Sequence, residues 1–102
     1  MDGIKTILNF IIKMKFKFEK SNRKNKKYMV TTTSGKVVHF GDTRYQHYKD
    51  STGLSLYSHL DHLDKKRRDN YRTRHKSILL KNGKPAYLDP EQPSYFSYKY
   101  LW

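Results

Sequence analysis

The sequence predicts a single α+β domain, in which a three-stranded antiparallel meander packs on one long helix and on a short aromatic C-terminal helix. The first observation behind this prediction is a series of short segments between residues 14 and 41 with the alternation or the β-branched content of strands. The second is the polar run at residues 62–75, where acidic, basic and aromatic residues recur every three or four positions, as on one side of a helix. The length of 102 residues allows one small domain.

The first 13 residues form an apolar segment with a helix-like period, too short to span a bilayer. We expect a helix that packs on the domain or on a neighbouring molecule. The alternative is an anchor at a membrane surface, with residues 4–12 in contact with lipid and lysines close behind. The period changes at Met14, which divides the chain into an N-terminal apolar extension, residues 1–13, and a single small basic domain, residues 14–102. We expect the domain to fold without the extension.

Three strands follow in order. Met14, Phe16 and Phe18 alternate with lysines, which predicts a strand with one buried face. Residues 28–33 are rich in β-branched residues and predict the second strand. The third is predicted at residues 36–40, after a tight turn at Ser34 and Gly35.

The long helix is predicted to begin near Ser58, with Asp61 completing an arrangement like a capping box, and to run to about residue 80. The sequence Asn-Gly-Lys-Pro at 82–85 then ends it. A last short helix is predicted at residues 95–102, where five residues are aromatic. We interpret these rings as core side chains that cover the meander, with stacking on nucleic-acid bases as the alternative.

A structural polar network is expected on the long helix. Its apolar stripe is predicted to include leucines at 60 and 63, Tyr71 and isoleucine at 78, and both Arg67 and Arg74 fall in line with it. Asp64 precedes Arg67 and Arg68 by three and four residues, the spacing of an intrahelical ion pair. Asp64 therefore either locks an arginine of the fold or orients one toward an anion.

A formal net charge of +13 favours an anionic partner, either nucleic acid or the acidic surface of a capsid protein. Basic residues concentrate at residues 21–40 and 61–80, on either side of a neutral connector. The residues that we expect to contact the partner lie on the exposed side of the long helix and in the first polar turn: Lys65, Lys66, Arg68, Arg72 and Lys76, with Arg23, Lys24, Lys26 and Lys27.

The sequence offers little for catalysis or for a cofactor. The absence of cysteine excludes disulfides and cysteine-ligated zinc. His59 and His62 lie three residues apart beside two acids, but the basic residues that follow would repel a metal cation. There is no phosphate-binding glycine loop and no readable set of nucleophile, base and orienting group. We therefore expect no enzyme, no cofactor and no metal.

Several motifs, taken in order, resemble a family of small uncharacterised basic proteins of giant DNA viruses and some phages. The resemblance covers about residues 15–102, and residues 1–13 are an addition to the family pattern. Its motifs are Phe16-Lys17-Phe18-Glu19-Lys20-Ser21-Asn22-Arg23-Lys24, Lys26-Lys27-Tyr28-Met29-Val30, Gly35-Lys36, His39-Phe40-Gly41, His62-x-Asp64-x-x-Arg67-Arg68-x-x-Tyr71-x-x-Arg74-His75 and Leu101-Trp102.

This resemblance implies a viral origin. It leads to a first hypothesis of a non-enzymatic virion component, a minor capsid or nucleic-acid-associated structural protein that acts within a larger assembly. The second hypothesis is a free, non-specific nucleic-acid-binding factor in the infected host cell. A nuclease-type enzyme, using histidines such as His39 and His75 as acid and base, is the third and least favoured.

Overall fold

Three antiparallel strands form one sheet in the order β1-β2-β3, as the sequence predicts. The computed structural model describes residues 16–102; the expected N-terminal extension, residues 1–13, and the first strand residue, Met14, lie outside the described residues. Strand β1 spans Lys17–Lys20, β2 spans Lys26–Thr31 and β3 spans Val37–Asp42. The three strands and two helices confirm the predicted α+β class.

The core lies between the sheet and the C-terminal helix α3, Pro93–Tyr100. The strand alternation predicts which residues enter it, because successive side chains point to opposite faces of a strand. Rings dominate this small core, and they meet mostly edge to face, the arrangement that aromatic quadrupoles prefer. Its buried members are Tyr28, Val30, Val38, Phe40, Phe96 and Leu101, and Phe16, Phe18, Tyr57, Tyr95, Tyr100 and Trp102 pack around them.

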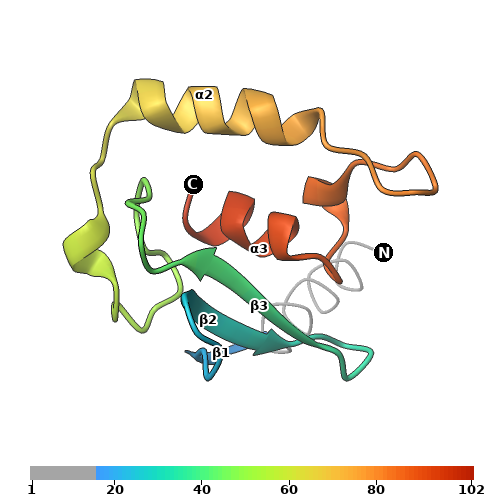
Figure 1. The fold of residues 1–102 in the computed structure, drawn as a ribbon, viewed down its shortest axis with the longest axis horizontal. Helices are drawn as coiled ribbons and strands as arrows, with labels where there is room; N and C mark the ends of the chain where they lie inside the picture. Colours follow the sequence, from blue (N-terminus) through green and yellow to red (C-terminus); the bar gives the residue numbers. More distant parts are fainter. Residues whose placement is uncertain (1–15) are drawn as a thin grey trace, which may run out of the picture.

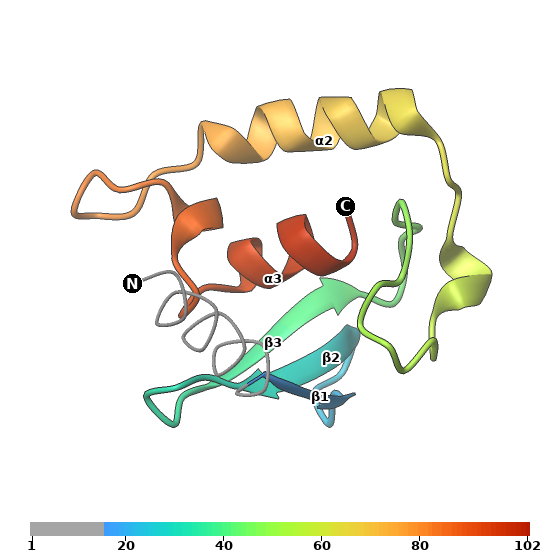
Figure 2. The same ribbon diagram turned by 180° about the vertical axis from the view of Figure 1, so that it is seen from behind.

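The long helix α2, Lys65–Lys76, does not lie directly on the sheet. Figures 1 and 2 show α3 between the sheet and α2 from both sides of the molecule. The contact between the two helices includes a parallel stack of Tyr71 on Trp102, with ring centroids 4.1 Å apart. No helix within residues 16–102 is both long and apolar enough to cross a membrane.

The predicted start of the long helix is wrong. Ser58–Leu60 form only a single 3-10 turn, η1, and Leu63 has a φ of 56°, which interrupts the helical path. The helix begins at Lys65 because the Asp64 carboxylate caps it, accepting hydrogen bonds from the main-chain N–H groups of Lys66 and Arg67 at 3.0 and 3.1 Å. Leucines 60 and 63 are therefore not part of the helical stripe.

The predicted end is also too late. After Lys76 the chain turns back on itself, so that Leu80 N donates to Lys84 O at 2.8 Å and Ala86 N donates to Ile78 O at 3.0 Å. Ile78 and the leucine beside it are exposed rather than part of an apolar helix face. The residues Ala86–Leu88 then form a second 3-10 turn, η2, that leads toward α3.

The connector between β3 and α2 holds the end of α3 in place. The main-chain N–H groups of Tyr48 and Lys49 both donate to Leu101 O at 3.0 Å, and Ser51 N donates to Tyr100 O at 2.8 Å. These bonds satisfy carbonyls that a helix C-terminus leaves without an internal partner. The connector, α2 and the last residues of the chain are thereby brought around one common space.

Candidate nucleic-acid interface

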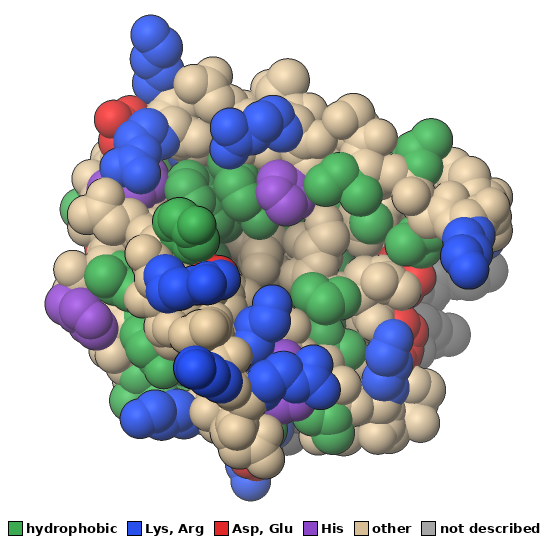
Figure 3. All heavy atoms as spheres, in the orientation of Figure 1, with side chains coloured by type: hydrophobic (Ala, Val, Ile, Leu, Met, Phe, Trp, Pro, Cys, Tyr) green, Lys and Arg blue, Asp and Glu red, His purple; other side chains and the backbone are tan. Residues whose placement is uncertain are grey.

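A cleft of about 570 Å³ lies between α2, the ends of β2 and β3, the connector and α3. Figure 3 shows Lys and Arg side chains around the hollow between α2 and the sheet. Residues far apart in the sequence line it: Lys26, Lys27, Phe40, Gly41, Asp42, Tyr45, Gln46, Arg67, Tyr71, Arg74, His75, Pro93, Ser94, Ser97, Leu101 and Trp102.

Aromatic rings from α2 and the C-terminus form one wall of the cleft. Tyr71 is stacked between Trp102, with centroids 4.1 Å apart and planes 5° from parallel, and His75, with centroids 3.8 Å apart. Burial raises the pKa of Tyr71 to about 12, so its hydroxyl is neutral at ordinary pH. The wall therefore consists of stacked rings, with polar atoms at the ring edges.

The rim is cationic. Lys26 comes from the start of β2, and Arg67 and Arg74 lie about two turns apart on α2. Arg67 Nη1 donates to Gln46 Oε1 at 3.0 Å, which leaves its charge without an acidic partner among the described residues. Arg74 likewise takes part in none of the ion pairs within residues 16–102.

Asp42 is the one acid among the described residues that line the cleft, and Arg44 neutralises it. The guanidinium of Arg44 forms two hydrogen bonds to the carboxylate, at 3.0 Å from Nε and 2.7 Å from Nη2. These bonds hold the pKa of Asp42 well below its usual range. A paired Asp42 therefore does little to offset the positive potential of the rim.

The inward and outward positions of α2 differ from the sequence prediction. Lys65, Lys66 and Lys76 are exposed, as expected. Arg68 and Arg72 are half-buried instead: Arg68 lies over the Tyr48 ring, 4.8 Å from its centroid. They face inward because Tyr71 sets the inner stripe of the helix, and positions 68, 72 and 75 share that side at a period of 3.6 residues.

Arg72 is a structural residue rather than a free cation. Its Nε and Nη2 both donate to the main-chain oxygen of Trp102, at 3.1 and 2.8 Å, and its guanidinium lies 5.4 Å from the centroid of Tyr98. This bidentate contact ties α2 to the C-terminal segment. The prediction that Arg72 projects toward a partner is therefore wrong.

The expected polar network on the helix is also wrong in part. Arg67 and Arg74 are exposed at the cleft rather than covered by the core. Asp64 caps the helix through its carboxylate and forms no ion pair with Arg67 or Arg68 in the described part of the chain. The expected pairing fails because a residue at the N-cap is not on the helix face that the spacing rule assumes. Tyr71 alone is inside, as predicted.

Of the four basic residues expected to contact a partner near the first polar turn, Lys26 and Lys27 lie at the start of β2 and line the cleft. Arg23 and Lys24 are exposed on the turn, and Lys26 is half-buried at the rim. Lys27 is only 2% exposed, so the prediction that it contacts an external anion is wrong. Its ammonium group instead donates to Tyr45 O at 2.9 Å and to His47 Nδ1 at 2.7 Å.

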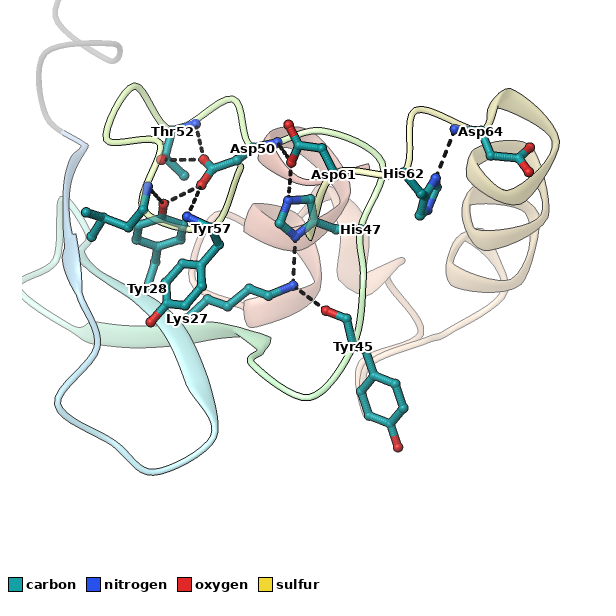
Figure 4. Close-up of polar contacts among 11 residues, drawn as sticks. Lys27, Tyr28, Tyr45, His47, Asp50, Thr52, Tyr57, Asp61, His62 and Asp64 are labelled. Atoms are coloured by element: carbon teal, nitrogen blue, oxygen red, sulfur yellow. Dashed lines mark hydrogen bonds and ion pairs between the residues drawn. The ribbon is translucent and has the colours of Figure 1, made fainter. Parts of the chain in front are cut away.

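Lys27, His47 and Asp61 form a buried chain of hydrogen bonds, named the relay below, which the sequence did not indicate (Figure 4). Because His47 Nδ1 accepts from Lys27, its Nε2 carries the proton and donates to Asp61 Oδ1 at 2.5 Å. The same oxygen accepts from Asp50 N at 2.9 Å. Burial lowers the pKa of Lys27 to about 8, and burial together with the Lys27 charge lowers the pKa of His47.

Asp50 is the centre of a second set of bonds in the same loop. Its Oδ1 accepts from Thr52 N at 3.1 Å and from Thr52 Oγ1 at 2.7 Å. Its Oδ2 accepts from Tyr57 N at 3.2 Å and from the hydroxyl of Tyr28, which in turn accepts from Leu56 N at 3.0 Å. Burial alone would raise the pKa of Asp50, but these hydrogen bonds hold it below its ordinary value.

The relay and the Asp50 bonds bind the connector to β2. Their donors and acceptors partner one another, and Lys27 uses its ammonium group within the fold. The arrangement fits a structural role better than acid–base chemistry on a substrate. Lys27 and Asp61 are 34 positions apart in the sequence, so no local spacing could have revealed this network.

His59 and His62 do not come together with acids as a metal-binding group. His62 Nδ1 accepts from Asp64 N at 2.9 Å, and its ring lies 5.1 Å from that of Trp102. Within residues 16–102 no group of three histidine or acidic residues has the geometry to hold a metal ion.

Comparison with known proteins gives a partial match. No curated protein and no solved structure matches the chain. Residues 16–52 match a family of unknown function (DUF5754). The matched segment contains the three strands, Lys27, His47 and Asp50, but neither α2 nor α3. Over the sheet and the first part of the connector, this chain is therefore similar to that family.

Proposed function

We propose that this protein is a non-enzymatic nucleic-acid-binding protein, and that the cationic rim of the cleft with the exposed face of α2 forms its contact surface. The observation that carries the proposal is the convergence of Lys26 from β2 with Arg67 and Arg74 from α2 on one cleft. The fold brings these cations together without acidic partners, so their positive electrostatic potential is available to attract an external polyanion.

The exposed lysines of α2 extend this surface. Lys65, Lys66 and Lys76 are exposed, and the ion pair of α2 within residues 16–102 is that of Arg68 with its neighbour Asp69. An exposed helix whose charged residues serve only to keep a domain soluble usually carries alternating charges of both signs along its exposed face. The excess of unpaired positive charge on α2 instead favours contacts with phosphate groups.

Salt-dependent binding tests the proposal. A fluorescently labelled oligonucleotide is titrated at several salt concentrations, and log affinity is plotted against log salt. Replacing Lys65 and Lys66 by Gln should weaken binding and lower the slope by up to roughly two units, since each phosphate contact contributes about 0.9. The matched control replaces Lys17 and Lys20 on β1, two exposed lysines at the far side of the molecule from α2.

The control separates local contact from overall charge, because both variants lose two positive charges. Equal reductions in slope would mean that the whole molecule acts as a diffuse cation and that α2 is not the contact surface. If the unmodified protein binds no nucleic acid at low salt, the proposal fails.

For the biological setting we retain the proposal of a virion component, with a free factor in the infected cell as the alternative. The resemblance described above is its support, and an acidic capsid surface is the second anionic partner that it implies. Quantitative mass spectrometry of purified particles distinguishes the two settings. Stoichiometric presence supports the virion component, whereas absence from particles with retained nucleic-acid binding supports the free factor.

A further inference from the structure

The cleft has the size and the wall chemistry of a site for one planar group. Its volume of about 570 Å³ lies within the range of small-molecule sites, roughly 300–1,000 Å³. The half-buried rings of Tyr71, His75 and Trp102 line its interior above the fully buried Phe40 and Leu101, and Ser94 and Ser97 lie at the α3 side. A phosphate alone would leave this apolar interior unused.

An exposed aromatic ring lies at the same site. Tyr45 lines the cleft and is 65% exposed, although large aromatic side chains are usually covered in a folded domain. Exposed rings beside cationic side chains are what unpaired bases stack on in proteins that bind single strands. Tyr45 therefore offers an accessible ring at the cleft on which a base can stack.

The buried relay gives Tyr45 a fixed position. Lys27 donates to the Tyr45 carbonyl at 2.9 Å, and Lys27 is itself held by His47. Arg44, the preceding residue, is bound to Asp42 through two hydrogen bonds. The main chain on both sides of the ring is thus anchored, which lowers the entropy lost when a ligand packs against Tyr45.

We propose that the cleft takes one unpaired base of a single-stranded nucleic acid, stacked against Tyr45, with the flanking phosphates on Lys26, Arg67 and Arg74. This inference rests on the proposed function and adds to it a preference for single strands. A duplex keeps its bases paired and stacked within the helix, so it can offer the rim only phosphates. A single strand can offer both phosphates and a base.

A ligand that lacks bases provides the first test. Binding of a short oligothymidylate is compared with binding of an abasic strand that has the same number of phosphates, and with a duplex of the same length. The fluorescence of Trp102, the one tryptophan of the chain, reports occupation of the cleft. We expect the oligothymidylate to bind more tightly and to change this fluorescence, and the abasic strand to leave it unchanged.

Variants of Tyr45 provide the second test. Tyr45→Ala should reduce affinity for the oligothymidylate between about fivefold and 150-fold, the range for loss of one stacked base, and should leave the abasic strand unaffected. Tyr45→Phe should retain the affinity, because stacking needs the ring and not the hydroxyl. Both replacements are at an exposed side chain, and equal melting temperatures will verify that the fold is intact.

The outcomes distinguish the two proposals. Equal affinity for the oligothymidylate and the abasic strand, or an unchanged affinity in Tyr45→Ala, would overturn the base site while leaving salt-dependent nucleic-acid binding in place. Failure of all three ligands to bind would overturn both. The charge component is checked by Arg67→Gln with Arg74→Gln, which should weaken single-strand binding more than Lys65→Gln with Lys66→Gln, two lysines of the same helix outside the cleft lining.

Discussion

Replacing Asp50 by Asn should destabilise the fold far more than the loss of one charge explains. Asp50 is 6% exposed and accepts four hydrogen bonds, two on each carboxylate oxygen. An Asn side chain keeps one acceptor oxygen and replaces the other with an NH₂ group. If the oxygen stays with Thr52, the amide faces the main-chain N–H of Tyr57, and two donors then oppose each other.

The magnitude follows from these contacts. A buried donor without a partner costs about 1–3 kcal/mol, and hydrogen bonds to a charged group contribute about 1.5–3 kcal/mol each. Partial rearrangement of the loop will recover some of this, so we expect a loss of roughly 2–4 kcal/mol in the free energy of unfolding. For a domain of this size the melting temperature should fall by about 10–20 °C.

Thermal and urea unfolding, followed by circular dichroism, measure the effect, with Asp69→Asn as the matched control. Asp69 loses the same charge, but its side chain is 67% exposed and bonded to Arg68, so its change should be within about 0.5 kcal/mol. Equal shifts for the two variants would refute the reasoning, because they would mean that the buried bonds of Asp50 contribute no net stability.

Acid should reduce the difference between the wild type and Asp50→Asn. The folded-state pKa of Asp50 lies below its ordinary value, so the carboxylate contributes stability that is present above about pH 4 and is lost as the pH falls through the folded-state pKa. Melting curves of both proteins between about pH 7 and pH 2.5 check this convergence. A constant difference over the whole range would contradict it.

Three further predictions concern other parts of the fold. Gly41→Ala should lower the free energy of unfolding by about 2–3 kcal/mol, because Gly41 has a φ of 76° and an added Cβ would lie 2.9 Å from a neighbouring side-chain atom. Gly35→Ala, with a φ of 87° and open space around it, should cost less in the same urea titrations. Asp64→Ala should lose the helix cap and about 1 kcal/mol, more than Asp69→Ala, and equal melting temperatures would contradict that role. Burial lowers the pKa of His47, so below about pH 6.5 the unfolded chain binds more protons than the folded one. The melting temperature should therefore fall between about pH 7.5 and pH 5, and a flat profile would show that His47 does not resist protonation.

The sheet and its core were predictable because their signals are local. These signals are the alternation at residues 16–18, the β-branched content of β2 and a glycine at the β2–β3 turn, and each acts over a few residues. The observed strands overlap the predicted ones, but β2 begins and ends two residues before the predicted 28–33, and β3 ends two residues after the predicted 36–40. The aromatic residues of α3 were likewise recognisable as core, and Phe96 is completely buried. When one face of a strand is buried, apolar residues recur at every second position of the sequence. The buried face can therefore be identified without knowing which element packs against it.

The boundaries and the orientation of α2 were not predictable in the same way. Ser58 and Asp64 are both good caps by residue type, and the choice between them depended on the connector, where Asp61 is already bound to His47. Moving the start also changed which residues belong to the stripe. Arg68 and Arg72 therefore became structural and Arg67 and Arg74 became exposed, because on a helix a shift of one position rotates a side chain by about 100°.

The amino-acid sequence by itself determined the α+β class, the strand order, the aromatic core and the strongly cationic character, since composition and local period suffice for these. Only the tertiary structure decided which cations share a site and which are buried. Lys26 is half-exposed at the rim of the cleft, whereas its neighbour Lys27 is buried and bonded to His47, which binds Asp61. The physical reason is that burial and hydrogen bonding depend on residues that folding brings together from distant positions, and no local spacing encodes those contacts.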